Sequence, residues 1–166
     1  PKVESAHRTL RALNPEVEIV PIDRALEGDL LREQVAASDA VVDGSDNFAT
    51  RFAVNAACVA AGKPLIAGAV IRWEGQVSVY TGRPGDPCYR CLYGEGGAVE
   101  ETCSQNGILA PVAGIVGSIQ ATETLKVLSG VGTTLAGRLL ILDALEMRFR
   151  TLTLARDPAC PVCARA

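Results

Sequence analysis

Two cysteine pairs with the same spacing constrain the fold of this chain more than any other feature. They are Cys88-Tyr89-Arg90-Cys91 and Cys160-Pro161-Val162-Cys163, and they lie far apart in the sequence. A Cys-x-x-Cys spacing lets two thiolates face one ion across a tight turn. We therefore expect Cys88, Cys91, Cys160 and Cys163 to form a closed structural zinc site, which clamps the end of the chain onto its middle. A catalytic zinc would keep one position open for water, so four cysteines argue against metal-borne catalysis.

Disulfides or redox thiols are the alternative explanation of the two pairs. A redox motif needs only one such pair, whereas a four-thiolate zinc site explains both, and the spacing favours zinc. The two remaining cysteines lack a partner at this spacing. Cys58 falls on the apolar face of a predicted helix and reads as core, whereas Cys103 lies between Thr102 and Ser104 and reads as a free thiol.

The length and composition indicate one globular domain. The chain has 166 residues, of which 48% are hydrophobic and 21% charged. A net charge of −3 gives no reason to expect nucleic acid or a membrane surface as a partner. No signal peptide and no apolar run of about 18 residues is evident, so we expect a cytoplasmic protein. The chain opens on Pro1 and enters a helical pattern at once, which suggests a piece of a longer chain.

Alternating strand and helix patterns over residues 15–67 predict an α/β fold with a parallel sheet and right-handed crossovers. After Gly68 the strictly alternating residues 76–80 indicate a strand with one wet face. Residues 93–107 show no periodicity and are interpreted as a mobile loop. The expected helices are 3–13, 26–37, 48–61 and 111–128. The expected strands are 17–22, 40–43, 64–67, 76–80, 139–142 and 148–154, the last two antiparallel.

Two carboxylates follow a predicted parallel strand, where ligands of open α/β sheets bind. Asp43 ends the strand and Asp46 precedes the helix that begins at residue 48. Asp46 could cap this helix, or it could hold Mg²⁺ against the phosphates of a nucleotide. Lys2 could supply an ammonium group to the phosphates. The chain contains neither a Gly-x-Gly-x-x-Gly motif nor a Walker-type loop, so a nucleotide would lack its usual backbone cradle here.

Several short motifs occur together in this chain and in a fixed order. They are Lys2-Val3-Glu4-Ser5-Ala6, Asn14-Pro15, Ser45-Asp46-Asn47 with Arg51, Gly75-Gln76, Pro87-Cys88-Tyr89-Arg90-Cys91-Leu92, Gly107-x-x-Ala110-Pro111 and Cys160-Pro161-Val162-Cys163. In this combination the chain resembles the MoeB/ThiF/HesA family over essentially its whole length. Members of that family are adenylyltransferases that activate ubiquitin-like sulfur carriers.

The resemblance implies a reaction and a set of site residues. Such enzymes use ATP and Mg²⁺ to adenylate the C-terminal glycine of a MoaD- or ThiS-type carrier, and they act as homodimers. By resemblance, Asp46 is the Mg²⁺-binding aspartate, and Lys2 and Asn47 belong to the ATP site. The four paired cysteines correspond to the zinc ligands. Cys103 matches a loop cysteine that in some relatives links covalently to the carrier or takes part in sulfur transfer.

The chain departs from the family pattern upstream of Lys2. Family members carry there a glycine-rich nucleotide loop, an acidic ribose-binding residue and phosphate-binding arginines, none of which occurs here. We therefore expect residues 1–166 to be the C-terminal part of a single adenylation domain, Rossmann-like with helices on both faces of a mixed sheet, and inactive alone. One alternative is a non-catalytic zinc-stabilised module that binds a ubiquitin-like partner. Another is a fragment of an NAD(P)-dependent oxidoreductase, which the missing glycine loop argues against.

Overall fold

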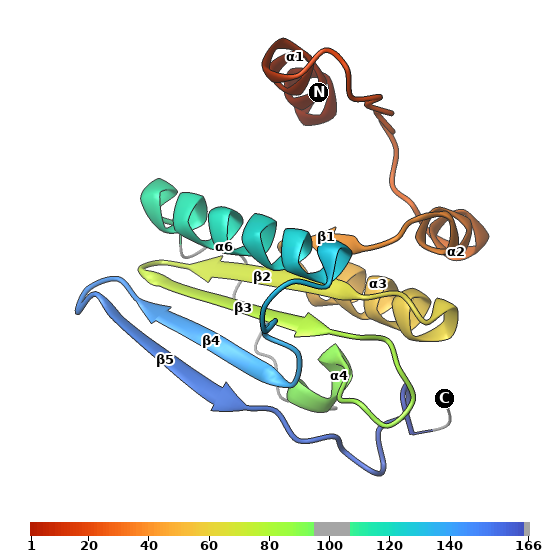
Figure 1. Cartoon of the computed structure of the whole chain (residues 1–166), viewed down its shortest axis with the longest axis vertical. Coiled ribbons are helices and arrows are strands. Elements are labelled where there is room, and N and C mark those ends of the chain that lie inside the picture. The colour runs from red at the N-terminus through yellow and green to blue at the C-terminus, as the bar shows by residue number, and fades with distance from the viewer. Residues whose placement is uncertain (95–106, 165–166) are drawn as a thin grey trace.

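A five-stranded mixed sheet forms the centre of the computed structural model, which describes residues 1–94 and 107–164 (Figure 1). The strands pair in chain order, and only the first pair is parallel. The hairpin turn between the second and third strands holds Arg72 at φ +50°, as a tight two-residue turn requires. The strands are β1 (Val41–Asp43), β2 (Leu65–Ile71), β3 (Glu74–Tyr80), β4 (Arg138–Asp143) and β5 (Arg148–Thr153).

Helices cover both faces of the sheet, and each face has its own hydrophobic core. The helices of the described chain are α1 (Lys2–Leu13), α2 (Gly28–Ala37), α3 (Phe48–Ala61), α4 (Tyr89–Leu92) and α6 (Ala110–Ser129). Alternate residues of β2 point to opposite faces: Leu65 packs with α3, whereas Ile66 packs with Val112 and Val116 of α6. The mixed sheet with helices on both faces confirms the predicted fold class.

Local sequence signals explain where α3 begins and ends. The Asn47 side chain accepts a hydrogen bond from the Thr50 N–H at 2.8 Å and caps the first turn. Gly62 stops the helix at φ +63°, a left-handed conformation that glycine adopts without strain. Both limits agree with the predicted helix 48–61.

The prediction was wrong for residues 17–22, which form no strand. Val17 and Val20 lie 55% and 70% exposed on the connection between α1 and α2, and no described strand lies beside them. An alternating pattern indicates an extended segment with one apolar and one polar side. A β-strand also needs a neighbouring strand to pair with its backbone hydrogen-bonding groups. The parallel part of the sheet is consequently only the pair β1 and β2.

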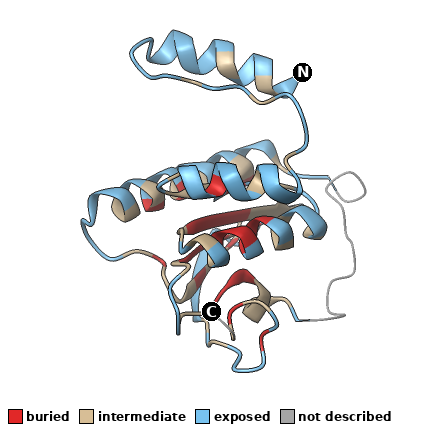
Figure 2. Cartoon of the chain, turned by 90° about the vertical axis from the view of Figure 1, so that its right-hand side faces the viewer, coloured by how far each residue is buried: buried red, intermediate tan, exposed pale blue. Residues whose placement is uncertain are grey.

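Helix α1 stands apart from the sheet and its covering helices (Figure 1). It contains no buried residue, and Leu10 and Leu13 are 50% and 78% exposed. Figure 2 shows the buried residues gathered in the sheet and the helices against it, while α1 is almost wholly exposed. No helix within the described residues has the length and apolar character needed to cross a membrane.

A buried glutamine joins α6 to the parallel strand pair. Gln120 is 7% exposed. Its side-chain amide donates to the carbonyl oxygens of Asp43 at 2.8 Å and Ile66 at 3.2 Å. Gly68 makes room for it, because a Cβ atom there would lie 2.4 Å from the Gln120 side chain. The amide therefore satisfies two carbonyl groups in the core beside the end of β1.

Replacing Gln120 by leucine is expected to lower the free energy of unfolding by about 1–3 kcal/mol, because two buried carbonyl groups lose their donor. Urea denaturation measures this change. Gln34→Leu, the same substitution at an exposed position of α2, is the control and should change the free energy by less than about 0.5 kcal/mol. An unchanged unfolding midpoint for Gln120→Leu would contradict the role given to the amide.

Candidate functional site

The four cysteines of the two pairs come together at one place. Their sulfur atoms all lie within 4.8 Å of one another, and Cys88, Cys160 and Cys163 are buried. The Sγ atoms of Cys88 and Cys160 are 3.7 Å apart, and those of Cys91 and Cys163 are 3.4 Å apart. Tetrahedral zinc with bonds of about 2.3 Å places its sulfur ligands roughly 3.8 Å apart. The cluster therefore fits a four-coordinate metal ion and joins the chain's end to its middle.

None of the five cysteines within the described residues forms a disulfide. The sulfur separations of 3.7 and 3.4 Å are longer than the roughly 2.05 Å of a disulfide bond, so the structure presents four thiols at this place. Burial raises the pKa of the Cys88 and Cys163 thiols. A bound cation counteracts this effect, because a coordinating thiol loses its proton outright. Metal binding at this cluster therefore has to displace the protons of the buried thiols.

Asp46 lies in the short loop between β1 and α3. The loop is held by Asp43, whose Oδ1 accepts a hydrogen bond from the Ser45 N–H at 2.9 Å. Asn47, rather than Asp46, caps α3. The exposed Asp46 carboxylate makes no hydrogen bond or ion pair with any other described residue. A free carboxylate beside a helix N-terminus can hold a cation against an anionic ligand.

Arg51 holds the Asp46 loop from the first turns of α3. Its Nε donates to the Ser45 carbonyl oxygen at 3.0 Å, and its Nη2 donates to the same oxygen. Its Nη1 donates to the Tyr89 hydroxyl at 3.3 Å. Tyr89 lies between two of the metal-site cysteines, so one guanidinium group connects the Asp46 loop to the cysteine cluster. Burial raises the pKa of Tyr89 to about 12, which keeps this phenol neutral at pH 7.

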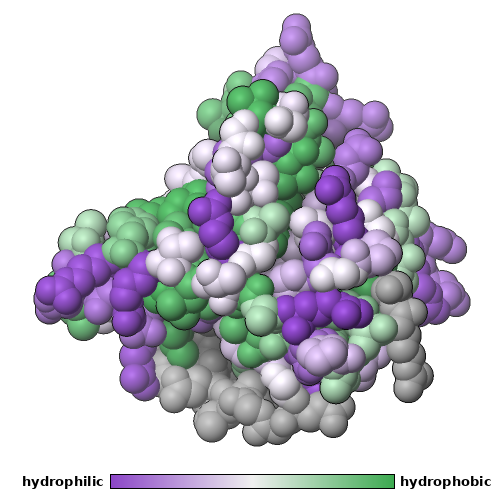
Figure 3. All heavy atoms as spheres, turned by 60° about the horizontal axis from the view of Figure 1, so that its bottom comes forward, coloured by the Kyte–Doolittle hydropathy of each residue, from purple (hydrophilic) through white to green (hydrophobic). Residues whose placement is uncertain are grey.

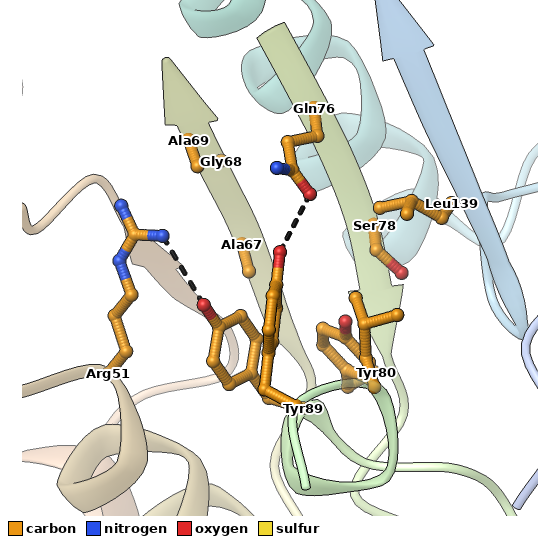
Figure 4. A pocket seen from close by; sticks show the side chains of 11 residues that line it. Arg51, Ala67, Gly68, Ala69, Gln76, Ser78, Tyr80, Tyr89 and Leu139 are labelled. Atoms are coloured by element: carbon orange, nitrogen blue, oxygen red, sulfur yellow. Dashed lines mark hydrogen bonds between the residues drawn. The ribbon is translucent and has the colours of Figure 1, made fainter. Parts of the chain in front are cut away.

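A narrow aromatic pocket lies beside this connection (Figure 4). Arg51 and Gln76 point into it from α3 and β3, toward the tyrosine rings. The Tyr93 hydroxyl donates to Gln76 Oε1 at 2.8 Å. The rings of Tyr89 and Tyr93 lie 4.8 Å apart, and Phe48 contacts Tyr93 at 5.3 Å. The pocket thus brings the polar strand residue Gln76 close to the loop that holds Asp46.

The remaining predicted site residues are placed differently. Lys2 lies on α1, which stands apart from the Asp46 loop (Figure 1). Cys103 lies outside the described residues, as does most of the predicted mobile loop 93–107. Cys58 is 1% exposed, and burial followed by the charge of Asp43 raises its pKa to about 12. Cys58 is therefore the inert core thiol that the sequence predicts.

Sequence reasoning missed two polar residues that organise the site. Asn55 lies in the middle of α3 and is 1% exposed, and Gln120 lies in the middle of α6. The signal in the sequence was a polar side chain on the apolar face of a predicted helix. Burying such a side chain without a hydrogen-bond partner costs free energy, so a partner is expected. The identity of that partner depends on long-range packing, which spacing along one helix does not contain.

Comparison with protein families supports the resemblance found in the sequence. The ThiF family profile matches residues 1–162. The chain belongs to the ThiF family. Its cysteine pairs and its Ser45-Asp46-Asn47 loop are thus features of a ThiF-family chain.

Curated relatives of this ThiF-family chain are adenylyltransferases by name. It is 44% identical over 163 residues to the molybdopterin-synthase adenylyltransferase of Escherichia coli, covering 98% of this chain and 66% of the relative. It is 46% identical to a sulfur carrier protein adenylyltransferase of Thermus thermophilus, of which it covers 62%. It is 39% identical to the ThiS adenylyltransferase of Escherichia coli, of which it covers 64%. The chain spans less than two thirds of the length of each.

Solved structures show the same fold. The structure of the microcin C7 biosynthetic enzyme MccB in complex with N-formylated MccA matches with a TM-score of 0.81 at 22% identity. The match covers 98% of this chain and 52% of MccB. At this identity the likeness concerns the fold alone: the two chains share their arrangement of sheet and helices.

Removing one thiolate is expected to abolish metal retention. Purified protein should contain about one metal ion per chain, and Cys163→Ser should reduce this to near zero, because an incomplete site binds far more weakly. Elemental analysis after gel filtration measures the ratio. Cys58→Ala is the control, since this buried thiol lies outside the cluster, and it should keep the metal. Full metal content in Cys163→Ser would contradict the four-cysteine site.

Proposed function

We propose that this chain is the C-terminal part of an adenylation domain that activates a ubiquitin-like sulfur carrier of the MoaD or ThiS type. In the proposed reaction the terminal glycine carboxylate of the carrier attacks the α-phosphate of ATP, and pyrophosphate leaves. The observation that carries the proposal is the free Asp46 carboxylate just beyond the carboxyl end of β1, in a loop whose Ser45 carbonyl oxygen is bonded by Arg51. The names of the curated relatives support the same reaction class.

The residues of the Asp46 loop can position a nucleotide for this reaction. When bound, Mg²⁺ neutralises phosphate charge and helps pyrophosphate to leave. Asp46 would hold this ion with its free carboxylate. The N-terminus of α3 adds a positive partial charge beside it, because the first peptide N–H groups of a helix point outward. Arg51 keeps the loop in place by its two bonds to the Ser45 carbonyl.

Further roles complete the proposal. In this proposal Lys2 contacts the ATP phosphates, although α1 stands apart from the Asp46 loop in the described chain (Figure 1). Asn47, whose side chain caps α3, shapes the loop at the nucleotide. Cys103 takes part in sulfur transfer or in a covalent link to the carrier. The ion in the cysteine cluster is structural zinc, because four sulfur ligands leave no coordination position for water. The nucleotide loop of the family lies outside these 166 residues, so the chain alone is inactive in this proposal.

Replacing Asp46 by asparagine is expected to reduce carrier-dependent ATP–pyrophosphate exchange by about 100-fold or more, equivalent to about 2.7 kcal/mol of transition-state stabilisation. The measurement uses protein that carries the complete adenylation domain, together with a sulfur carrier. Asp39→Asn, an exposed carboxylate outside the loop, is the matched control and should retain activity.

The exchange assay also separates this function from a non-catalytic binding module. A module that only docks a ubiquitin-like protein would bind the carrier and show no exchange in the unaltered protein. Exchange activity that Asp46→Asn leaves intact would instead contradict the role of Asp46 in holding Mg²⁺.

We also propose that the protein is a homodimer through the outer face of α6. This face carries small exposed residues, Gly114, Gly117, Ser118 and Ala121, at successive helical turns. A groove beside it runs between Pro111 and Phe149 of β5. Figure 3, which turns the lower side of Figure 1 forward, shows hydrophobic residues gathered at several places on that face between projecting hydrophilic ones. Small side chains let a second helix approach closely.

Replacing Gly117 by glutamate is expected to convert the dimer into monomers, because a charged side chain would be buried at the contact. The monomer should stay folded, since no atom lies within 4 Å of a Cβ at this position. Sedimentation velocity measures the mass. Ala36→Glu, on the exposed face of α2, is the control and should remain dimeric. A dimeric Gly117→Glu protein would exclude this face as the interface.

A further inference from the structure

Asn55 connects α3 to the cysteine cluster by two hydrogen bonds. Its Oδ1 accepts from the Tyr89 N–H at 2.9 Å, and its Nδ2 lies 3.6 Å from Cys88 Sγ, within reach of an N–H···S bond. The residue is 1% exposed, so its amide is shielded from bulk solvent. The amide oxygen of Asn55 thus bonds the backbone between Cys88 and Cys91, and the amide nitrogen bonds the Cys88 sulfur.

We propose that Asn55 is a positioning residue that donates a hydrogen bond to the metal-bound thiolate of Cys88 and so ties helix α3 to the metal site. The inference rests on the zinc site proposed above. It assigns to the site a fifth residue that belongs to neither cysteine pair and lies 33 positions before Cys88. Outer-shell donors of this kind orient metal ligands and tune the electron density on them.

Charge explains why the site needs such a donor. Four thiolates bring four negative charges to an ion that carries two positive charges, and the cluster is largely buried. A charge-assisted N–H···S bond withdraws electron density from the Cys88 sulfur, which stabilises the thiolate. Besides Asn55, the Cys88 sulfur has the neighbouring cysteine sulfurs and the backbone N–H groups of its own turn as partners, so Asn55 supplies its side-chain amide.

The same residue links the metal to the proposed nucleotide site. Asn55 and Arg51 lie one turn apart on α3, and both contact Tyr89, Asn55 at the backbone and Arg51 at the hydroxyl. Arg51 in turn holds the Ser45 carbonyl next to Asp46. A metal ion that fixes Cys88 therefore fixes Tyr89 and, through α3, the start of the Asp46 loop.

A simpler role would be that Asn55 only satisfies the buried Tyr89 N–H. The two roles are separated by Asn55→Asp, which keeps the acceptor for Tyr89 and replaces the amide donor by an oxygen. Asn55→Leu removes both groups and serves as the second variant. Val54→Ala, a neighbouring core position that packs with Leu65 rather than with the cluster, controls for a general loss of α3 packing.

Two measurements test the proposal on purified, metal-loaded protein. The first is the rate at which zinc passes to an excess of a chromophoric chelator, which should rise by about 10- to 100-fold in Asn55→Asp and Asn55→Leu. The second is the sulfur-to-cobalt charge-transfer band of the Co²⁺-substituted protein. This band should move to lower energy in both variants, because the sulfur lone pairs lose their hydrogen bond. Val54→Ala should change neither quantity.

The outcomes distinguish this inference from the zinc proposal. Metal in the unaltered protein with unchanged release and an unchanged cobalt spectrum in both variants would overturn the role of Asn55 and leave the zinc site standing. No metal in the unaltered protein would overturn the zinc site and this inference with it. Faster release in Val54→Ala as well, without any spectral shift in the Asn55 variants, would reduce Asn55 to a packing role.

Discussion

The packing of helix α3 against the sheet is the constraint on which the rest of the structure depends. Its first turn is capped by Asn47 and carries the Asp46 loop, and its apolar face packs on β2 through residues such as Val54 and Cys58. Its middle reaches the cysteine cluster through Asn55. A single rigid element therefore spans from the candidate nucleotide site to the candidate metal site. Any shift of α3 would be felt at both, because close-packed interiors transmit displacement rather than absorb it.

The cysteine cluster adds a long-range closure to this arrangement. The segment of Cys88 and Cys91 follows the central strand β3, whereas Cys160 and Cys163 follow β5 at one edge of the sheet. A metal ion that joins them closes a loop containing α6, β4 and β5. A cross-link across a long loop removes more conformational entropy from the unfolded chain than one across a short loop, so it stabilises the folded chain more. The clamp consequently stabilises the part of the chain that contains β5, an edge strand with no buried residue.

Features set by local sequence could be predicted, and features set by distant partners could not. The limits of α3 follow from Asn47 and Gly62, and the cysteine cluster follows from spacing alone. The failed strand 17–22 had the right alternation but no neighbour to pair with. Strand β2 runs on to Ile71, beyond the predicted end at residue 67, because β3 folds back along it. The bond from Arg51 to Tyr89 spans 38 positions, so no local pattern indicates it.

Each face of the sheet carries its own hydrophobic core, and the candidate sites and the proposed dimer interface lie on different faces. The core on the α3 side contains Tyr80 and Tyr89 and lies against the candidate sites, whereas the core on the α6 side contains Val77, Val112 and Leu142. Helix α6 approaches β3 so closely that a Cβ atom at Gly75 would lie 2.6 Å from Val116. The inner face of α6 is thus committed to the sheet, and only its outer face can serve a partner. Changes on that outer face and changes at the cysteine cluster share no side-chain contact among the described residues, so their effects on stability should add.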